Sequence, residues 1–167
     1  NIEIIKLSAH INNFRIDHDQ FTVISAAIGS PPGYCKLVSG DDNIADGMLA
    51  CSDEALDEYN RRFYSVNARA GPKYYKTRAK VPVVHLDRVV NERLVDVMKI
   101  DVEGHEQEAL SPASAGRFFG SSPRVNALLT EFSPWVAQSV GLQPLDYLKQ
   151  LSAWGLNCTP ALSFDRS

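Results

Sequence analysis

Residues 95–110, VDVMKIDVEGHEQEAL, join an apolar run to a dense group of ionisable side chains. The group comprises Lys99, Asp101, Glu103, His105, Glu106 and Glu108. Carboxylates and an imidazole can act as general bases and acids in a reaction site. Acids at the start of a helix are also stabilised by its dipole, by roughly 0.3–1 kcal/mol each, without any catalytic role. A solvated helix start explains Glu106 and Glu108, whereas Asp101 lies before the expected helix and needs another explanation.

A further carboxylate, Glu131, ends the next apolar run along the chain. In a parallel α/β sheet, ligands bind outside the carboxyl ends of the strands. If strands 94–102 and 125–132 are neighbours, at about 4.8 Å spacing, Asp101 and Glu131 face the same crevice. Lys99 lies on the same strand face as Asp101, where it either forms a plain ion pair or positions a ligand. We therefore expect a ligand site at this edge of the sheet.

Three other kinds of site can be tested against the sequence. The run HEQEA opens like the zinc-protease motif H-E-x-x-H, but Ala109 stands where the second histidine ligand would be. The chain has neither a phosphate-binding P-loop motif nor the G-x-S-x-G nucleophile motif. Two carboxylates are too few to hold Mg²⁺ or Ca²⁺, so we predict no metal site and rank a carboxylate-metal hydrolase last.

The elements that position these side chains follow from hydrophobic periodicity. The helical spacing of Ile4, Leu7 and Ile11 predicts a helix over 2–13. The other expected elements are a buried strand at 20–29 with a short partner in YCKLV, strands 94–102 and 125–132, a helix in PLDYLKQLSAWG, and a last strand in LNCTPAL. Strands joined by helical crossovers pair in parallel, so the sequence predicts an α/β fold with a mostly parallel sheet.

Residues 41–80 differ in character from the rest of the chain. An acidic stretch comes first, and a basic stretch with Phe63, Tyr64, Tyr74 and Tyr75 follows it. Charge blocks of this kind are usually solvated loop or helix faces. The alternative is a cap whose basic, aromatic half meets an anionic or sugar-like substrate.

The composition limits which classes of protein and which partners fit this sequence. The 167 residues fit one domain, and a net charge of −3 gives no basic field for nucleic acid. No apolar run approaches the ~20 residues of a membrane span. Cys35, Cys51 and Cys158 are odd in number and widely spaced, which predicts reduced thiols and, by default, a cytoplasmic protein. The oligomeric state cannot be predicted from these features.

One family resemblance accounts for the group at 95–110. The segments VVHLDRVV, VDVMKIDVEGHEQEALSPAS and NALLTEFSP resemble the later half of the FkbM-type methyltransferases, a branch of the class I fold that uses S-adenosylmethionine (SAM). The matching residues are Leu86-Asp87, Lys99-Ile100-Asp101-Val102-Glu103-Gly104, Glu106, Leu110 and Glu131-Phe132. FTVISAAIGS resembles the third strand of the same family. The resemblance implies a Rossmann-like, mostly parallel sheet, with Ala26, Ala27, Lys99 and Asp101 as cofactor-binding residues.

The family's glycine-rich SAM loop and its ribose-binding acid have no counterpart in the sequence. We therefore expect a single partial domain over 1–167 that lacks the first βαβ unit, with 41–80 as a variable insertion or cap. This fragment is expected to be inactive on its own. The resemblance implies SAM-dependent methylation of a hydroxyl on a sugar or small natural product in the complete protein. Asp101 would line the reactive end of the donor, Glu103 or His105 would act as base, and Glu131 would contact the acceptor. The alternative is a non-catalytic relic of the fold that serves as a binding or scaffold module.

Overall fold

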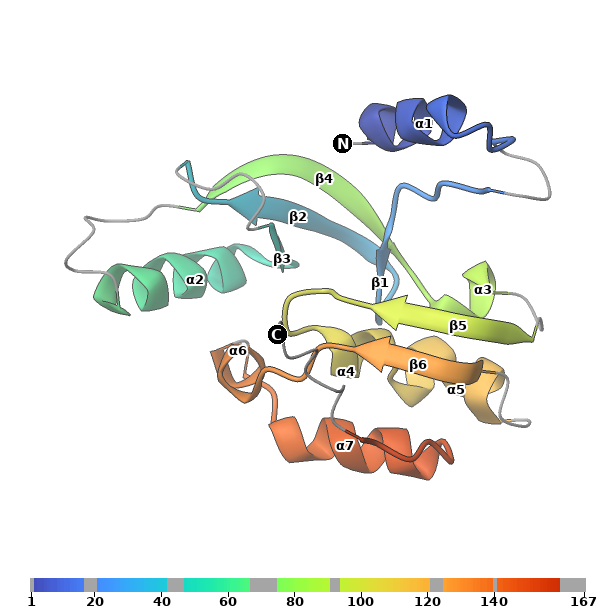
Figure 1. Ribbon diagram of the computed structural model, residues 1–167. Coiled ribbons are helices and arrows are strands. Elements are labelled where there is room, and N and C mark those ends of the chain that lie inside the picture. The colour runs from blue at the N-terminus through green and yellow to red at the C-terminus, as the bar shows by residue number, and fades with distance from the viewer. Residues whose placement is uncertain are drawn as a thin grey trace, which may run out of the picture.

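The computed structural model gives the arrangement of helices and strands over most of the chain (Figure 1). It describes residues 2–16, 21–41, 47–66, 75–90, 94–120, 125–139 and 141–159. Within these ranges the strands form two separate sheets rather than one. No helix in the same ranges has both the length and the apolar character needed to cross a bilayer.

The first sheet is mixed, with the strand order β1-β4-β2-β3. Its members are β1 (Ala27–Ile28), β2 (Gly33–Ser39), β3 (Met48–Ala50) and β4 (Lys76–Val84). β1 pairs with β4 in parallel, whereas β2 is antiparallel to both β3 and β4. Only residues 40–47 connect β2 to β3, and so short a connection permits an antiparallel pair but not a parallel one. The prediction of a single, mostly parallel sheet is therefore wrong for this half of the chain.

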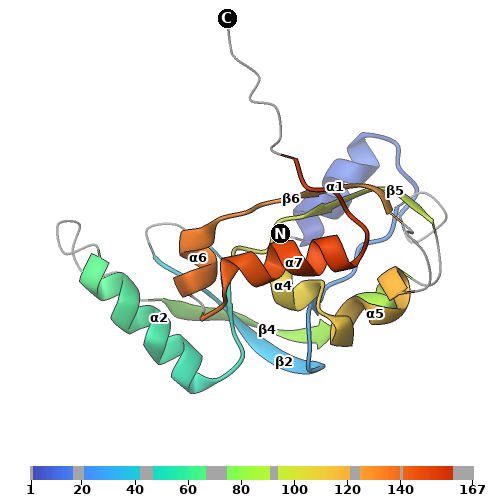
Figure 2. The ribbon, with the colours of Figure 1, turned by 90° about the horizontal axis from the view of Figure 1, so that it is seen from below.

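The second sheet is the parallel pair β5 (Val95–Ile100) and β6 (Val125–Thr130). This pairing confirms that the strands predicted at 94–102 and 125–132 are neighbours. Three helices, α4 (Glu106–Ala109), α5 (Pro112–Gly120) and α7 (Pro144–Ala153), cover one face of the pair. Seen from below, α7 runs alongside α4 (Figure 2).

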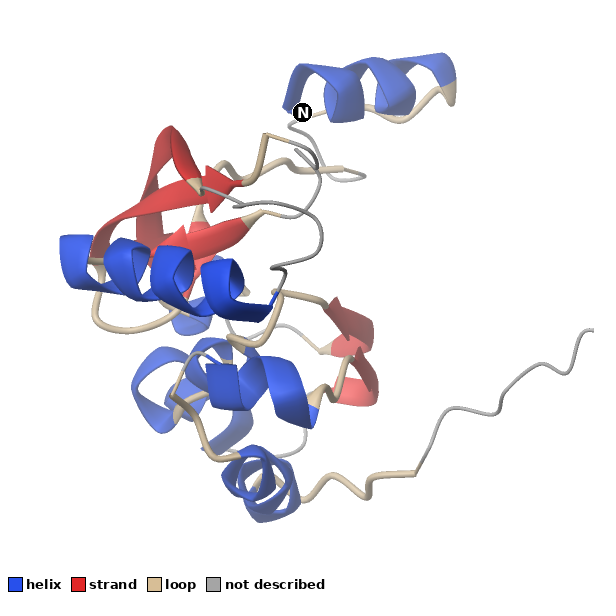
Figure 3. Ribbon diagram, turned by 90° about the vertical axis from the view of Figure 1, so that its left-hand side faces the viewer, coloured by secondary structure: helices blue, strands red, loops and turns tan. Residues whose placement is uncertain are grey.

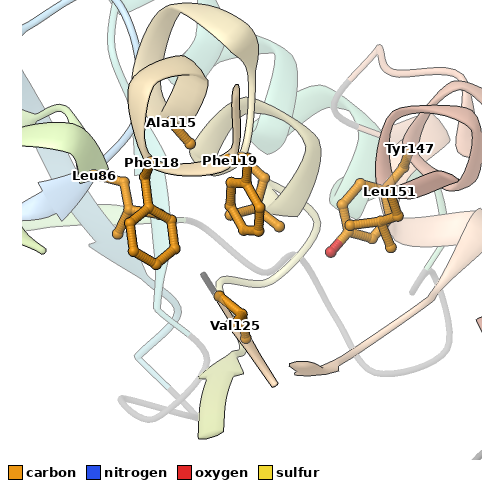
Figure 4. Packing of buried hydrophobic residues seen from close by; sticks show 8 residues of the cluster. Leu86, Ala115, Phe118, Phe119, Val125, Tyr147 and Leu151 are labelled. Atoms are coloured by element: carbon orange, nitrogen blue, oxygen red, sulfur yellow. The ribbon is translucent and has the colours of Figure 1, made fainter. Parts of the chain in front are cut away.

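A hydrophobic core lies between these helices and the β5–β6 pair (Figure 4). Its buried members are Leu86, Leu110, Ala115, Phe118, Phe119, Val125, Tyr147 and Leu151. Each large apolar side chain buried in this way contributes roughly 1.5–3 kcal/mol. The core thus fixes the strand ends at which the predicted site lies.

The opposite face of the β5–β6 pair is not covered by the described residues. Val97 is 70 % exposed and Leu129 is 51 % exposed on this face. Helix α1 (Ile2–Ile11) confirms the helix predicted at 2–13, but Ile4 and Leu7 on its apolar face are also exposed. α1 lies at one end of the molecule, away from the strands (Figure 3).

One strand prediction is wrong, a second finds no strand in its described part, and one helix prediction is confirmed. The segment 20–29 is not a buried strand, because only Ala27–Ile28 form one and several of the preceding side chains are exposed. No strand forms over 156–159, and the rest of LNCTPAL lies outside the described residues. Helix α7 begins at Pro144, and Gly155 with φ +81° follows its end, as expected.

The cysteines also differ from the prediction. Cys35 in β2 and Cys51 after β3 form a disulfide, whereas Cys158 is free and exposed. The two residues lie one position beyond the paired Lys36 and Ala50, so antiparallel pairing brings them together. Their spacing of 16 residues hides this proximity in the sequence. The thiol argument for a reducing compartment therefore fails, and a cytoplasmic location stays a prediction.

A second, smaller core joins helix α2 to the mixed sheet. Helix α2 (Asp53–Val66) and β3 contribute Tyr59, Met48 and Ala50, which pack with Val38 and Tyr75. α3 (Leu86–Val89) and α6 (Pro134–Ser139) complete the helices of the described chain. Part of the segment predicted as a charged cap is thus a helix packed against the sheet.

Candidate active site

Asp101 and Glu131 lie at the same end of the parallel pair. Ile100 pairs with Thr130, and each acid follows its strand directly. Lys99 Nζ lies 2.5 Å from Asp101 Oδ2, which confirms the ion pair predicted within this strand. Both side chains are largely exposed, so the pair contributes little to stability. It sets the Lys99 ammonium beside the Asp101 carboxylate at the strand end.

A tight turn follows the strand and sets the direction of the next helix. Glu103 has φ +52° and Gly104 has φ +93°, two consecutive left-handed residues. A Cβ added to Gly104 would lie 2.6 Å from Val136 Cγ1, so only glycine fits here. A non-glycine residue at positive φ costs of order 1–3 kcal/mol, and such residues cluster at functional sites. The turn places His105 directly before α4.

The His105 imidazole contacts a partner through each ring nitrogen. Nδ1 is hydrogen-bonded to Oε2 of Glu108, three residues further along the chain. Nε2 lies 3.2 Å from the hydroxyl of Tyr59, which comes from α2. The imidazole is thus held between a carboxylate and a phenol, the environment that commonly orients a histidine in acid–base chemistry.

His105 and Glu108 line a cavity of about 280 Å³. Its other walls come from the mixed sheet and the loop after β1. They are formed by Ile28, Gly29, Ser30, Pro31, Pro32, Gly33, Tyr34, Cys35, Leu49, Cys51 and Val83. A mostly apolar cavity with a few convergent polar groups is the usual form of a small-molecule site.

Comparison with known families identifies the family of the chain. Residues 3–155 match the methyltransferase FkbM domain. The chain belongs to the FkbM methyltransferase family. No curated protein and no solved structure matches it. The match covers most of the chain and confirms the resemblance seen in the 95–110 motif.

The FkbM domain does not gather all the predicted site residues at one place. Glu131 lines a separate, water-sized hollow with Gly104 and Tyr147 rather than the larger cavity. Ala26 and Ala27 lie in and next to β1, in the other sheet, and line neither of these two hollows. Their predicted cofactor role stays a prediction.

Two acids in the FkbM motif region have structural roles. Glu106 is only 6 % exposed, and its Oε1 accepts a hydrogen bond from the Val102 backbone N–H at 3.1 Å. Asp87 accepts hydrogen bonds from the backbone N–H groups of Arg117 and Phe118, at 3.0 and 2.8 Å. The prediction that Glu106 is a solvated helix-start residue is therefore wrong. It closes the turn that carries His105.

Glu108 and Tyr59 both contact His105, and the sequence did not indicate either contact. Glu108 seemed to be a surface acid of the helix start, but it is bonded to His105. The spacing of three residues between His105 and Glu108 carries this signal, because such residues are neighbours on a helix. Tyr59 lies 46 residues from His105, and no local pattern connects the two.

The described residues offer no group of three or more metal-ligating side chains.

The clearest electrostatic effect near the strand ends concerns Tyr147, whose hydroxyl lies 2.8 Å from Thr130 Oγ1. Burial raises the pKa of Tyr147 to about 12, because a phenolate is disfavoured away from water. Tyr147 therefore stays neutral and holds the end of β6.

Proposed function

We propose that this FkbM domain transfers a methyl group from SAM to a hydroxyl oxygen of a sugar or small natural product. One observation carries the proposal. His105 and Glu108 form a hydrogen-bonded pair on the wall of a cavity, and they follow Asp101 through the turn after β5. A hydroxyl must lose its proton as it attacks, and a positioned base typically contributes 10²–10⁴-fold to such a step.

The residues at the end of β5 suit the reactive end of SAM. The Asp101 carboxylate is accessible and paired with Lys99, and a carboxylate is the group expected beside a sulfonium or a ribose hydroxyl. Lys99 in turn offers a cation for the cofactor's own carboxylate. When bound, SAM would supply the electrophilic methyl group.

The chain's own groups then do three things. The apolar walls of the cavity hold the acceptor and keep water from competing for the methyl group. Both nitrogens of His105 are engaged, so neither is available to take the hydroxyl proton. The Glu108 carboxylate has more lone pairs than its bond to His105 uses, and one of them can take that proton. This assigns the base to Glu108, oriented by His105, rather than to Glu103 or to His105 alone. The predicted contact of Glu131 with the acceptor stays a prediction.

The proposal is tested with methyl-labelled SAM and the full-length protein. A panel of acceptors should include a methyl glycoside, a phenol and an aliphatic alcohol, with the corresponding thiols and amines as controls. We expect label to appear as a methyl ether on at least one hydroxyl compound. Transfer only to nitrogen or sulfur, or no transfer despite SAM binding, would contradict the proposal.

The uncovered apolar face at Val97 and Leu129 favours a second candidate function, a non-catalytic binding or scaffold module. Calorimetry separates the two functions. A full-length protein with a micromolar dissociation constant for SAM supports the enzyme, and the absence of SAM binding supports the module.

A further inference from the structure

Tyr59 reaches the His105–Glu108 pair from a distant part of the chain. Its ring is buried in the smaller core beside Tyr75, with the ring centroids 6.3 Å apart. Its hydroxyl lies 2.9 Å from the Leu49 carbonyl oxygen and 3.2 Å from His105 Nε2. The hydroxyl has only one proton to donate, and it lies within hydrogen-bond distance of both of these groups.

Helix α2 is held firmly enough to fix this hydroxyl in place. The Ser52 hydroxyl accepts a hydrogen bond from the Ala55 backbone N–H at 3.1 Å and caps the start of the helix. Asn60 Oδ1 accepts a bond from the Tyr75 backbone N–H at 2.7 Å, which ties the middle of α2 to the start of the strand region. Tyr59 lies between these two anchors.

The two partners of Tyr59 suit the two protonation states of His105. In the neutral imidazole, Glu108 requires a proton on Nδ1, because a carboxylate only accepts hydrogen bonds. Nε2 is then an acceptor, and Tyr59 donates to it. In the imidazolium, Nε2 carries a proton and donates to the Tyr59 oxygen. The Tyr59 proton then turns to the Leu49 carbonyl, which can only accept.

We infer that Tyr59 is a positioning residue that holds the His105 ring in both protonation states and thereby keeps Glu108 directed into the cavity. The ring need not move when its charge changes, because only the Tyr59 hydroxyl rotates. Helix α2, part of the segment predicted as a solvated face or a cap, thus belongs to the support of the site. The inference rests on the proposed function only in treating Glu108 as the base.

The first test is the tautomer of His105 in the unaltered chain. Long-range ¹H–¹⁵N spectra, recorded where the ¹⁵N shifts show a neutral imidazole, report which ring nitrogen carries the proton. His105→Gln assigns the signal among the four histidines. We expect the Nδ1–H tautomer. The Nε2–H tautomer would overturn the inference, because Nδ1 would then have no proton to donate to Glu108.

The second test is solvent exchange of the His105 Nδ1 proton in Tyr59→Phe. This variant keeps the buried ring and removes only the hydroxyl, so the imidazole loses one of its two anchors. We expect exchange at least tenfold faster than in the wild type. Tyr147→Phe is the matched control, since it removes another buried hydroxyl, which contacts the Thr130 hydroxyl. Exchange of the His105 proton in this control should stay within twofold of the wild-type rate.

Exchange in Tyr59→Phe within twofold of the wild type would overturn the inference, as would an equal acceleration in Tyr147→Phe. If Tyr59→Phe does not fold, the tautomer of the wild-type chain decides alone. Neither readout uses SAM or an acceptor. A failure of methyl transfer would therefore count against the proposed function and leave the support of His105 by Tyr59 intact.

Discussion

Glu108 lies one helical turn beyond His105 and is hydrogen-bonded to its Nδ1, on the wall of the cavity formed with the mixed sheet. The pair joins the two halves of the structure, because His105 follows β5 while Tyr59, its other partner, belongs to α2. A side chain that seemed to be a surface acid is thus placed as the base of the proposed reaction.

Glu108→Gln should lower the rate of methyl transfer by about 10²-fold or more, because it removes the base and keeps the size of the side chain. The steady-state rate at saturating SAM measures this effect. Asp146→Asn is the control, since Asp146 pairs with Lys149 on α7. A Glu108→Gln rate within threefold of wild type would exclude Glu108 as the base.

Gly104→Ala should destabilise the fold by roughly 2–4 kcal/mol, because alanine is strained at φ +93° and its Cβ would overlap Val136. Urea unfolding measures the loss. Gly116→Ala is the control, and it should change the stability in the opposite direction. Gly116 lies within α5 with open space around it, so alanine there should stabilise by about 0.5–1 kcal/mol. Equal stability of the two variants would refute the account of the turn.

Replacing both Cys35 and Cys51 by serine should cost about 3 kcal/mol in the free energy of unfolding, the value typical of a disulfide that closes a loop of this size. The midpoint of urea unfolding gives the comparison. Cys158→Ser should change stability by less than about 0.5 kcal/mol, because Cys158 is exposed and free. If the double variant unfolds with the wild-type midpoint, the disulfide does not stabilise the fold.

Tyr147 should make the protein less stable as the pH rises from about 10 to about 12. Burial raises the pKa of its hydroxyl in the folded state to about 12, above the unfolded value of 10.0. The stabilisation is complete below pH 10 and is lost as the pH approaches 12, since only the unfolded chain has released its proton in between. The loss amounts to roughly 2–3 kcal/mol.

Unfolding curves at pH 9 and pH 11 check this, with Tyr147→Phe as the control. The variant should show a smaller decrease between the two pH values. An identical decrease in both proteins would show that Tyr147 does not cause it.

The sequence predicted the second half of the fold better than the first. The strands at β5 and β6 and the helix α7 follow from continuous apolar runs with clear starts and stops, and their local patterns suffice. The mixed sheet depends on pairings between distant segments. An apolar run at 20–29 therefore suggested a buried strand where only Ala27–Ile28 pair.

The contacts of the site divide in the same way, into local ones that could be predicted and long-range ones that could not. Lys99 lies in β5 and Asp101 directly follows it, two residues further along the chain, so their ion pair could be predicted from strand geometry. The contacts of His105 with Tyr59, and of Cys35 with Cys51, depend on how α2 and β3 fold back over the sheet. No local pattern in the sequence encodes how α2 and β3 fold back over the sheet.

The most direct test of the central claim is Asp101→Asn in the full-length protein, with SAM affinity and methyl transfer measured together. The proposed function puts Asp101 at the reactive end of the donor, and loss of a charged hydrogen-bonding group costs about 1.5–3 kcal/mol. We predict a loss of roughly tenfold or more in SAM affinity and a greater loss in the transfer rate. SAM affinity and transfer both within a few-fold of wild type would contradict the assignment of the site to the end of β5.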